Sequence, residues 1–359
     1  MGVFAKYLVK ELFKLLIICE LIFISIYLMI DFTGGIDDFV KANASTGVMI
    51  SYYIYKIPAI AVQMLPAATL TAIIIVFCTM KRNNEIIALR ACGINIWRIS
   101  QPVIITAFFL SIVLFLFSEI IVPYSSAKSN EIWRVSVKKQ DPGGFKGQNH
   151  IWLRGKSCIY WIKRFDGQKM IMIEPTFYFF DPSFHVIKRI DARFGVWKEG
   201  WWRIKEGIVQ DREKSGDYYS LSRFKELDLR LPEKPGDFVR EEREPEEMGY
   251  HQLNRFTERL TMEGYDATEY VVGLNIKIAF PFIVLIMALI GIPVALWKKG
   301  MGTPLAVSIG IVLCFFYLLI LGVSRSLGLA GVLPPILSAW LANSIFLFLG
   351  LYQMMRVNR

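Results

Sequence analysis

The chain has 359 residues, 54% of them hydrophobic, and a positive mean hydropathy of +0.42. Soluble globular proteins are usually about 45–50% apolar, so this composition favours a membrane protein. The formal net charge is +10, but many Lys and Arg residues lie at the ends of apolar segments, which is typical of membrane topology rather than of nucleic-acid binding. With three histidines and no Cys-x-x-Cys pair among five cysteines, the sequence argues against a metal site.

Six apolar stretches come close to or exceed the roughly 20 residues that a helix needs to cross a bilayer core. The first is too long for the apolar region of a signal peptide and lacks a small-residue cleavage site after it, so we interpret it as a retained helix. We therefore expect three transmembrane helices within 1–123 and three within 266–359. The stretches are Leu12–Ile30, Ile54–Thr79, Ile99–Val122, Ile278–Trp297, Pro304–Val323 and Ile336–Met355.

The direction of insertion follows from the short segments that flank these helices, because cytoplasmic flanks are enriched in Lys and Arg. The flanks on one side hold eleven such residues, whereas the short loops on the other side hold two. We therefore expect both termini in the cytoplasm and the insertion 124–265 on the outer side of the membrane. The eleven are Lys6, Lys10, Lys14, Lys81, Arg82, Arg90, Arg98, Lys298, Lys299, Arg356 and Arg359, and the two are Lys41 and Arg325.

The insertion 124–265 contains short runs rich in β-branched and aromatic residues, separated by turn residues such as Asp166-Gly167. This spacing predicts an all-β domain of the sandwich or jelly-roll kind. A charged linker is expected over 231–249 and an amphipathic helix over 250–260. The expected strands are His150–Leu153, Cys158–Arg164, Met170–Phe180, His185–Ile190, Phe194–Lys198, Trp201–Gln210 and Tyr218–Phe224.

Six tryptophans lie in or near this domain, and they allow two interpretations. The first is ordinary packing in the core of a β-domain. The second is an apolar groove that holds lipid chains between two sheets. The six are Trp133, Trp152, Trp161, Trp197, Trp201 and Trp202.

Three stretches of the sequence resemble one known family over essentially the whole chain. The loop 82–93 reads RNNEIIALRACG, the entry and body of the fourth helix include GYDAT at 264–268, KIAFPF at 277–282 and LIGIP at 289–293, and the last helix carries LPP at 333–335 and AWLAN at 339–343. These residues resemble the LptF/LptG (YjgP/YjgQ) permeases of the lipopolysaccharide exporter. The first external loop, 31–41, is more similar to the G-type subunit than to the F-type.

The resemblance implies a fold, partners and a location. The expected fold is membrane α-helical, with six transmembrane helices plus a periplasmic all-β jelly-roll-like domain between the third and fourth. The expected partners are an F-type paralogous permease, two copies of a cytoplasmic P-loop ATPase and a single-helix periplasmic jelly-roll protein of the LptC type. The complex would lie in the inner membrane of a Gram-negative bacterium, extract lipopolysaccharide and pass it to a periplasmic bridge.

No Gly-x-x-x-x-Gly-Lys-Ser/Thr loop occurs in the sequence, so we expect no cofactor in this chain and assign ATP and magnesium to the partner ATPase. The resemblance makes the loop about 81–97 a coupling helix and Glu85 its acidic residue that meets the ATPase. Arg82, Leu89 and Arg90 complete the expected coupling site. On its residues alone, the loop would favour a solvated surface helix, and the resemblance reverses that preference.

A polyanionic lipid requires cations at the outer membrane surface. The candidates for head-group binding are Lys41, Arg134, Lys138, Lys139 and Arg325, although each on its own could be an ordinary surface cation. The nearby Asp31, Asp37 and Asp38 weaken this positive field.

Charged residues inside apolar segments form a separate group. Glu119 and Lys277 fit a position at the membrane interface, whereas Glu20 lies deep enough to need a partner or water.

Two other functions compete with transport. One is a membrane scaffold or sensor whose outer β-domain recruits a partner. The other is a membrane-embedded enzyme that modifies lipids, which the sequence disfavours because it shows no Ser/His/Asp, paired-His or Cys/His constellation. We therefore expect no catalytic and no metal-binding residues in this chain.

Overall fold

The computed structural model describes residues 2–139, 148–154, 158–166, 169–181, 185–198, 200–212, 219–231, 235, 244–262, 266–297 and 302–358. The chain forms two compact units. The first contains 1–132, 244–257 and 266–359, and the second contains 133–243 and 258–265. The expected insertion 124–265 and the second unit have different bounds: α-helix continues to Ile132, and 244–257 belong to the first unit.

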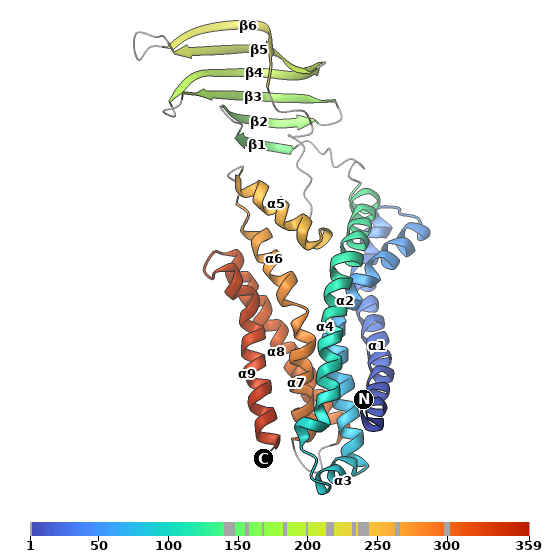
Figure 1. The fold of residues 1–359 in the computed structure, drawn as a ribbon. Coiled ribbons are helices and arrows are strands. Elements are labelled where there is room, and N and C mark those ends of the chain that lie inside the picture. The colour runs from blue at the N-terminus through green and yellow to red at the C-terminus, as the bar shows by residue number, and fades with distance from the viewer. Residues whose placement is uncertain are drawn as a thin grey trace. The chain divides into compact units, whose positions relative to one another are not determined.

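The first unit is helical (Figure 1). Four of its helices are 27 to 39 residues long, and the described spans are long and apolar enough to cross a membrane. Its elements are α1 (Val3–Lys41), α2 (Thr46–Arg82), α3 (Glu85–Ala91), α4 (Ile96–Ile132), a 3-10 turn (Pro245–Glu247), α6 (Thr268–Ala279), α7 (Phe282–Leu296), α8 (Thr303–Leu329) and α9 (Pro335–Asn358). Helix α5 (Tyr250–Met262) begins in this unit and ends in the second.

The fourth span is a broken helix. Helices α6 and α7 meet at Phe280-Pro281 with a bend of 49°, so the described residues contain five unbroken spans and one bent one. The six spans predicted from the sequence are confirmed when the bent pair α6 and α7 is taken as one span. The bend was not predicted, because a hydropathy window averages across Pro281, whose missing N–H interrupts the helical hydrogen bonds.

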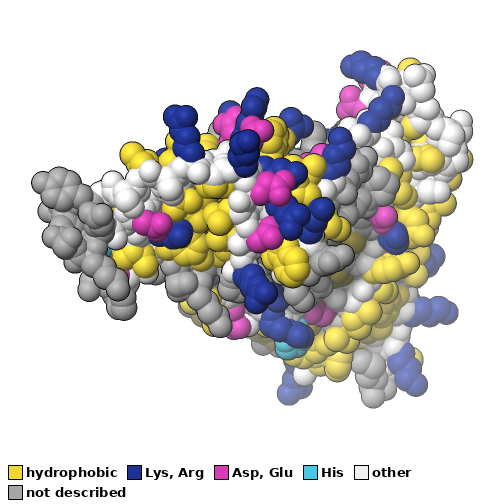
Figure 2. Space-filling model, turned by 90° about the horizontal axis from the view of Figure 1, so that it is seen from above, with side chains coloured by type: hydrophobic (Ala, Val, Ile, Leu, Met, Phe, Trp, Pro, Cys, Tyr) yellow, Lys and Arg dark blue, Asp and Glu magenta, His cyan; other side chains and the backbone are white. Residues whose placement is uncertain are grey.

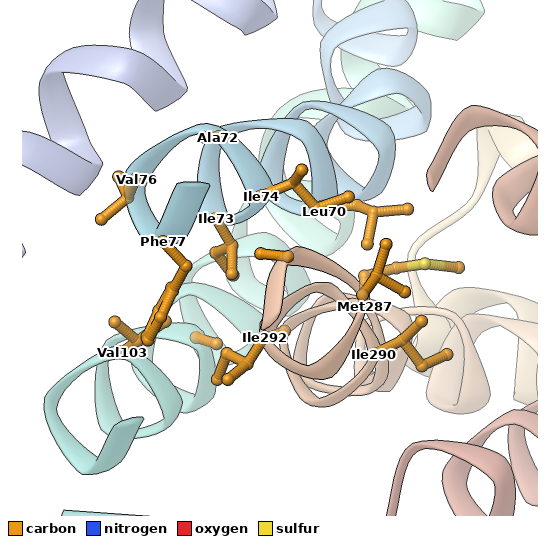
Figure 3. Packing of buried hydrophobic residues seen from close by; sticks show 14 of the residues in the cluster. Leu70, Ala72, Ile73, Ile74, Val76, Phe77, Val103, Met287, Ile290 and Ile292 are labelled. Atoms are coloured by element: carbon orange, nitrogen blue, oxygen red, sulfur yellow. The ribbon is translucent and has the colours of Figure 1, made fainter. Parts of the chain in front are cut away.

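Helix α7 lies at the centre of the first unit. Its side chains pack against α2 and α4, and Figure 3 shows Ile292 of α7 beside Ile73 and Phe77 of α2 and Val103 of α4. Nearly every residue of α7 is buried, whereas α1 and α8 leave long rows of large apolar side chains exposed. The core of the unit is thus built from its middle helices.

The second unit contains one antiparallel sheet of six described strands in sequential order (Figure 1). Tyr160 lies opposite Phe177, and Trp197 lies opposite Trp202, so aromatic residues form cross-strand neighbours. The strands are β1 (Gln148–Arg154), β2 (Cys158–Asp166), β3 (Ile171–Phe180), β4 (Val186–Lys198), β5 (Trp201–Arg212) and β6 (Tyr219–Leu229).

The expectation of a helical membrane part with an all-β domain is confirmed. Within the described residues, however, the strands form one meander, whereas a jelly roll pairs strands that are distant in sequence. The expected strands 185–190 and 194–198 are a single strand, β4. Asp191, which lies between the two expected strands, is part of β4 and accepts hydrogen bonds from the Thr176 hydroxyl and the Arg189 guanidinium.

The tryptophans differ in burial. Trp202 is fully buried, and Trp197 packs against it with ring centroids 5.0 Å apart, as expected for a core. Trp152 is 55% exposed and lies beside Trp161, so this pair contributes apolar surface to the outside. Figure 2 shows that hydrophobic side chains are also exposed among the charged ones on the face seen from above.

Candidate functional site

The short helix α3 has a precisely defined end. The backbone N–H of Gly93 donates to the carbonyl of Arg90 at 2.9 Å, and that of Ile94 donates to the carbonyl of Leu89 at 3.1 Å. These two bonds form a Schellman motif, which needs a left-handed residue, and Gly93 supplies it with a φ of +79°. The loop between α2 and α4 therefore has a fixed shape.

One side of α3 packs on the membrane helices of its own unit. Ile86 is buried, and Leu89 and Ile94 lie against the same apolar core. The structure thus places Leu89, one of the four expected coupling residues, on the inward side. Its role in this position is to hold α3 against the helices.

The other side of α3 is open. Arg82 and Arg90 are exposed, and Glu85 is half-buried and accepts a hydrogen bond from the Asn83 amide at 3.3 Å. Ile87 is 58% exposed, and sequence analysis missed it. The signal was present, because adjacent residues of a helix point about 100° apart, so Ile86 and Ile87 cannot both face the core.

The inner end of α7 is tied to α2 close to this loop. The Lys81 ammonium group donates to the carbonyl of Ala295 at 3.3 Å, and the Cys78 thiol contacts the same oxygen at 3.8 Å. Carbonyls in the last turn of a helix lack partners within the helix, and a cation there also suits the helix dipole. The end of α2 therefore links the loop at α3 to α7.

Side chains from other helices satisfy the break in the fourth span. Asn343 of α9 donates to the carbonyl of Ala279 at 2.7 Å, and Ser111 of α4 donates to the carbonyl of Pro281 at 2.6 Å. The Tyr317 hydroxyl of α8 donates to the side-chain oxygen of Asn343 at 2.6 Å. Free backbone carbonyls are costly at membrane depth, so these three side chains allow the helix to bend where it does.

A further ion pair joins α1 to α2. The Lys56 ammonium group lies 2.7 Å from a carboxylate oxygen of Asp31, and each side chain is 25% exposed. Lys56 also lies 3.0 Å from the hydroxyl of Tyr52. The charge of Asp31, which the sequence suggested would weaken the positive field, is therefore matched by a cation. Sequence analysis missed Lys56 because it lies inside an apolar stretch.

The comparison of the sequence with known families gives one match. Residues 6–356 match the family described as "Lipopolysaccharide export system permease LptF/LptG". The chain belongs to the LptF/LptG family. The comparison with curated proteins finds no match.

Membership of the LptF/LptG family makes the chain a transport component, in agreement with the expectation that it is not an enzyme. Its apolar helices, together with the family, indicate a multi-pass protein of the inner membrane. The family includes both the F-type and the G-type subunit, so the match does not distinguish between the two types.

The five expected head-group cations of this LptF/LptG chain are divided between its two units. Lys41 is exposed at the end of α1, and Arg325 is half-buried in α8, both in the first unit. Arg134, Lys138 and Lys139 follow α4 and belong to the second unit, with both lysines exposed. The structure thus brings no more than two of the five into the membrane unit.

The charged groups within the spans have different environments. Glu119, in the second half of α4, accepts a hydrogen bond from the backbone N–H of Tyr250 at 2.7 Å, so the position of its carboxylate is fixed. Both carboxylate oxygens of Glu20 are buried and have no hydrogen-bond partner among the described residues. The sequence indicated that Glu20 needs a partner, and the described part of the chain supplies none.

Proposed function

We propose that the chain is a G-type permease subunit that extracts lipopolysaccharide from the inner membrane and passes it to a periplasmic bridge. The family supports transport of this lipid, and the first external loop supports the G type. An F-type paralogue completes the membrane part of the complex. The β-domain lies in the periplasm, where it receives the lipid and adjoins a single-helix partner with a jelly-roll domain.

The open side of α3 is the observation that carries the proposal. Arg82, Glu85, Ile87 and Arg90 present an apolar side chain surrounded by charges, on a helix whose other side is held by Ile86. Interfaces commonly place an apolar anchor inside a polar rim. This surface docks one copy of a cytoplasmic P-loop ATPase, which binds ATP and magnesium, and the paralogue docks the second copy.

The outer surface supports the lipid path. Large apolar side chains of α1 and α8 are exposed in rows, including Ile22 and Ile26 of α1 and Phe315 and Phe316 of α8. Exposed rows of this kind are suited to acyl chains or to the paralogue's helices. Lys41 and Arg325 lie near the outer ends of the same two helices, where the phosphates of the head group would meet them. Arg134, Lys138 and Lys139, which belong to the second unit, are further candidates for contact with the head group.

Co-purification tests the proposal. The chain is expressed with its paralogue and the P-loop ATPase, and the ATPase retained on the tagged chain is quantified. Glu85→Lys should reduce the retained ATPase severalfold, because it reverses a charge on the docking side of α3. The matched control is Glu11→Lys in α1, which makes the same charge change at a carboxylate whose ion pair with Lys14 is long, at 3.7 Å. Equal retention by both variants, or no ATPase with the wild type, would refute the proposed docking.

A further inference from the structure

The segment 244–250 is anchored on the outer ends of the membrane helices by buried contacts. Glu247 is 7% exposed, and the Asn130 amide of α4 donates to it at 2.7 Å. At the other end of the segment, Glu119 accepts from the backbone N–H of Tyr250 at 2.7 Å. A Cβ added to Gly249 would lie 2.8 Å from a carboxylate oxygen of Glu119, so the backbone of Gly249 lies close to Glu119 of α4.

Glu246 lies in the same segment but has a different kind of contact. Its carboxylate is 3.6 Å from the guanidinium of Arg325 in α8, and the two side chains are 54% and 43% exposed. This separation is too long for a strong charge-assisted hydrogen bond, which needs about 2.7–2.9 Å. An exposed ion pair of this kind contributes little to stability. The segment is therefore held without Glu246, and the contact with Arg325 is easily exchanged.

Lys277 of α6 belongs to the same charge cluster. It is half-buried and interacts electrostatically with Glu119 and Glu246. Because Glu119 is engaged by the backbone of Tyr250, Glu246 is the carboxylate that can move away without breaking a buried contact. Removing it would leave two cations, Lys277 and Arg325, on the outer side of the unit.

We propose that Glu246 is an internal counter-anion that occupies Arg325 until a phosphate of the lipid head group replaces it. The inference rests on the proposed function, because it concerns the lipid that Arg325 would bind. A phosphate accepts two parallel hydrogen bonds from a guanidinium, whereas Glu246 at 3.6 Å makes a loose contact, so the phosphate is the stronger ligand. A lipid must bind Arg325 more strongly than Glu246 does in order to replace it. Phosphorylated lipids are therefore favoured over lipids without phosphate.

Equilibrium binding to the complete complex in nanodiscs tests the inference. The probes are fluorescent lipopolysaccharide with both lipid A phosphates and the same lipid with both phosphates removed. Glu246→Gln should bind the phosphorylated probe about two- to fivefold more tightly than the wild type, the range that loss of an exposed ion pair supports. Affinity for the dephosphorylated probe should stay unchanged, which also shows that the variant is folded.

Two controls separate the possible outcomes. Glu244→Gln makes the same charge change two residues away, at a carboxylate that contacts Asn130 at 3.3 Å, and should leave both affinities unchanged. When Glu246→Gln is combined with Arg325→Gln, the increase in affinity for the phosphorylated probe should disappear. An equal gain in Glu244→Gln, an unchanged affinity in Glu246→Gln or a weaker one would overturn the inference. If the wild type binds neither probe, the proposed function fails instead.

Discussion

The side-chain nitrogen of Asn343 donates a hydrogen bond of 2.7 Å to the carbonyl oxygen of Ala279, the last residue before the bend in the fourth span. Asn343 also accepts a hydrogen bond from Tyr317. One buried side chain thus satisfies a backbone carbonyl of α6 and a hydroxyl of α8.

Asn343→Leu should destabilise the chain, because the carbonyl of Ala279 and the hydroxyl of Tyr317 lose their partner in an apolar environment. The expected loss is about 1–3 kcal/mol. The measurement is thermal unfolding in detergent, followed by a thiol-reactive dye that reports exposure of the buried Cys78 and Cys314. Ser308→Ala is the control, since the Ser308 hydroxyl bonds only within the exposed side of α8. Equal unfolding temperatures would contradict the role of Asn343.

Two glycines of α8 should respond in opposite ways to alanine. A Cβ at Gly328 would lie 2.6 Å from the Cβ of Ser338 in α9, whereas nothing lies within 4 Å of one at Gly322. Gly328→Ala should therefore cost about 1–3 kcal/mol by forcing α8 and α9 apart. Gly322→Ala should be neutral or slightly stabilising, because alanine favours helix. The same unfolding assay measures the stability of both variants. A loss of stability in Gly322→Ala but not in Gly328→Ala would contradict this prediction.

Ile86 and Ile87 are neighbours with different expected roles. Ile87→Ser should reduce retention of the ATPase severalfold without lowering the unfolding temperature, because its side chain is exposed. Ile86→Ser should lower the unfolding temperature, because it places a hydroxyl in the apolar core under α3. Retention and unfolding are measured on the same preparations. If Ile87→Ser retains the ATPase fully, Ile87 is not part of the docking surface.

Asp228 of β6 gives the β-domain a pH dependence. A hydrogen bond from Arg203 of β5, 2.8 Å long, holds the pKa of Asp228 below its ordinary value. The contribution of this pair is therefore present above about pH 4 and is lost as the pH falls through the lowered pKa. Amide hydrogen exchange in β5 and β6, corrected for the intrinsic rate, should become faster relative to the other strands on acidification. In Asp228→Asn this relative change should shrink, and an unchanged profile would exclude the pair as its source.

The sequence predicted the features that depend on long runs of residues. Apolar length is enough to locate six spans, and alternating β-branched and aromatic residues are enough to locate the strands. The bend at Phe280-Pro281 was missed because a hydropathy window averages across Pro281, and the side chains that satisfy the bend, Ser111 and Asn343, are distant in sequence. The pairing of Asp31 with Lys56 was missed because Lys56 lies inside an apolar stretch.

The candidate site was predicted less completely than the fold. The loop 81–97 was located, but its inward and outward sides could be separated only once Leu89 was found against the core. Arg325 was selected as a cation, yet its neighbour Glu246 lies in a charged linker whose position the sequence does not define. Charge can be read from sequence, whereas the partner of each charge depends on the packed structure.

Transport in proteoliposomes tests the central claim most directly. Lipopolysaccharide is placed in vesicles that contain this chain, its F-type paralogue, the single-helix partner and the ATPase, and its ATP-dependent transfer to a soluble periplasmic acceptor is measured. The account predicts transfer that requires both ATP hydrolysis and this chain, and that falls severalfold in Arg325→Glu or Lys41→Glu. Transfer at the same rate without this chain, or no transfer with every component present, would contradict it.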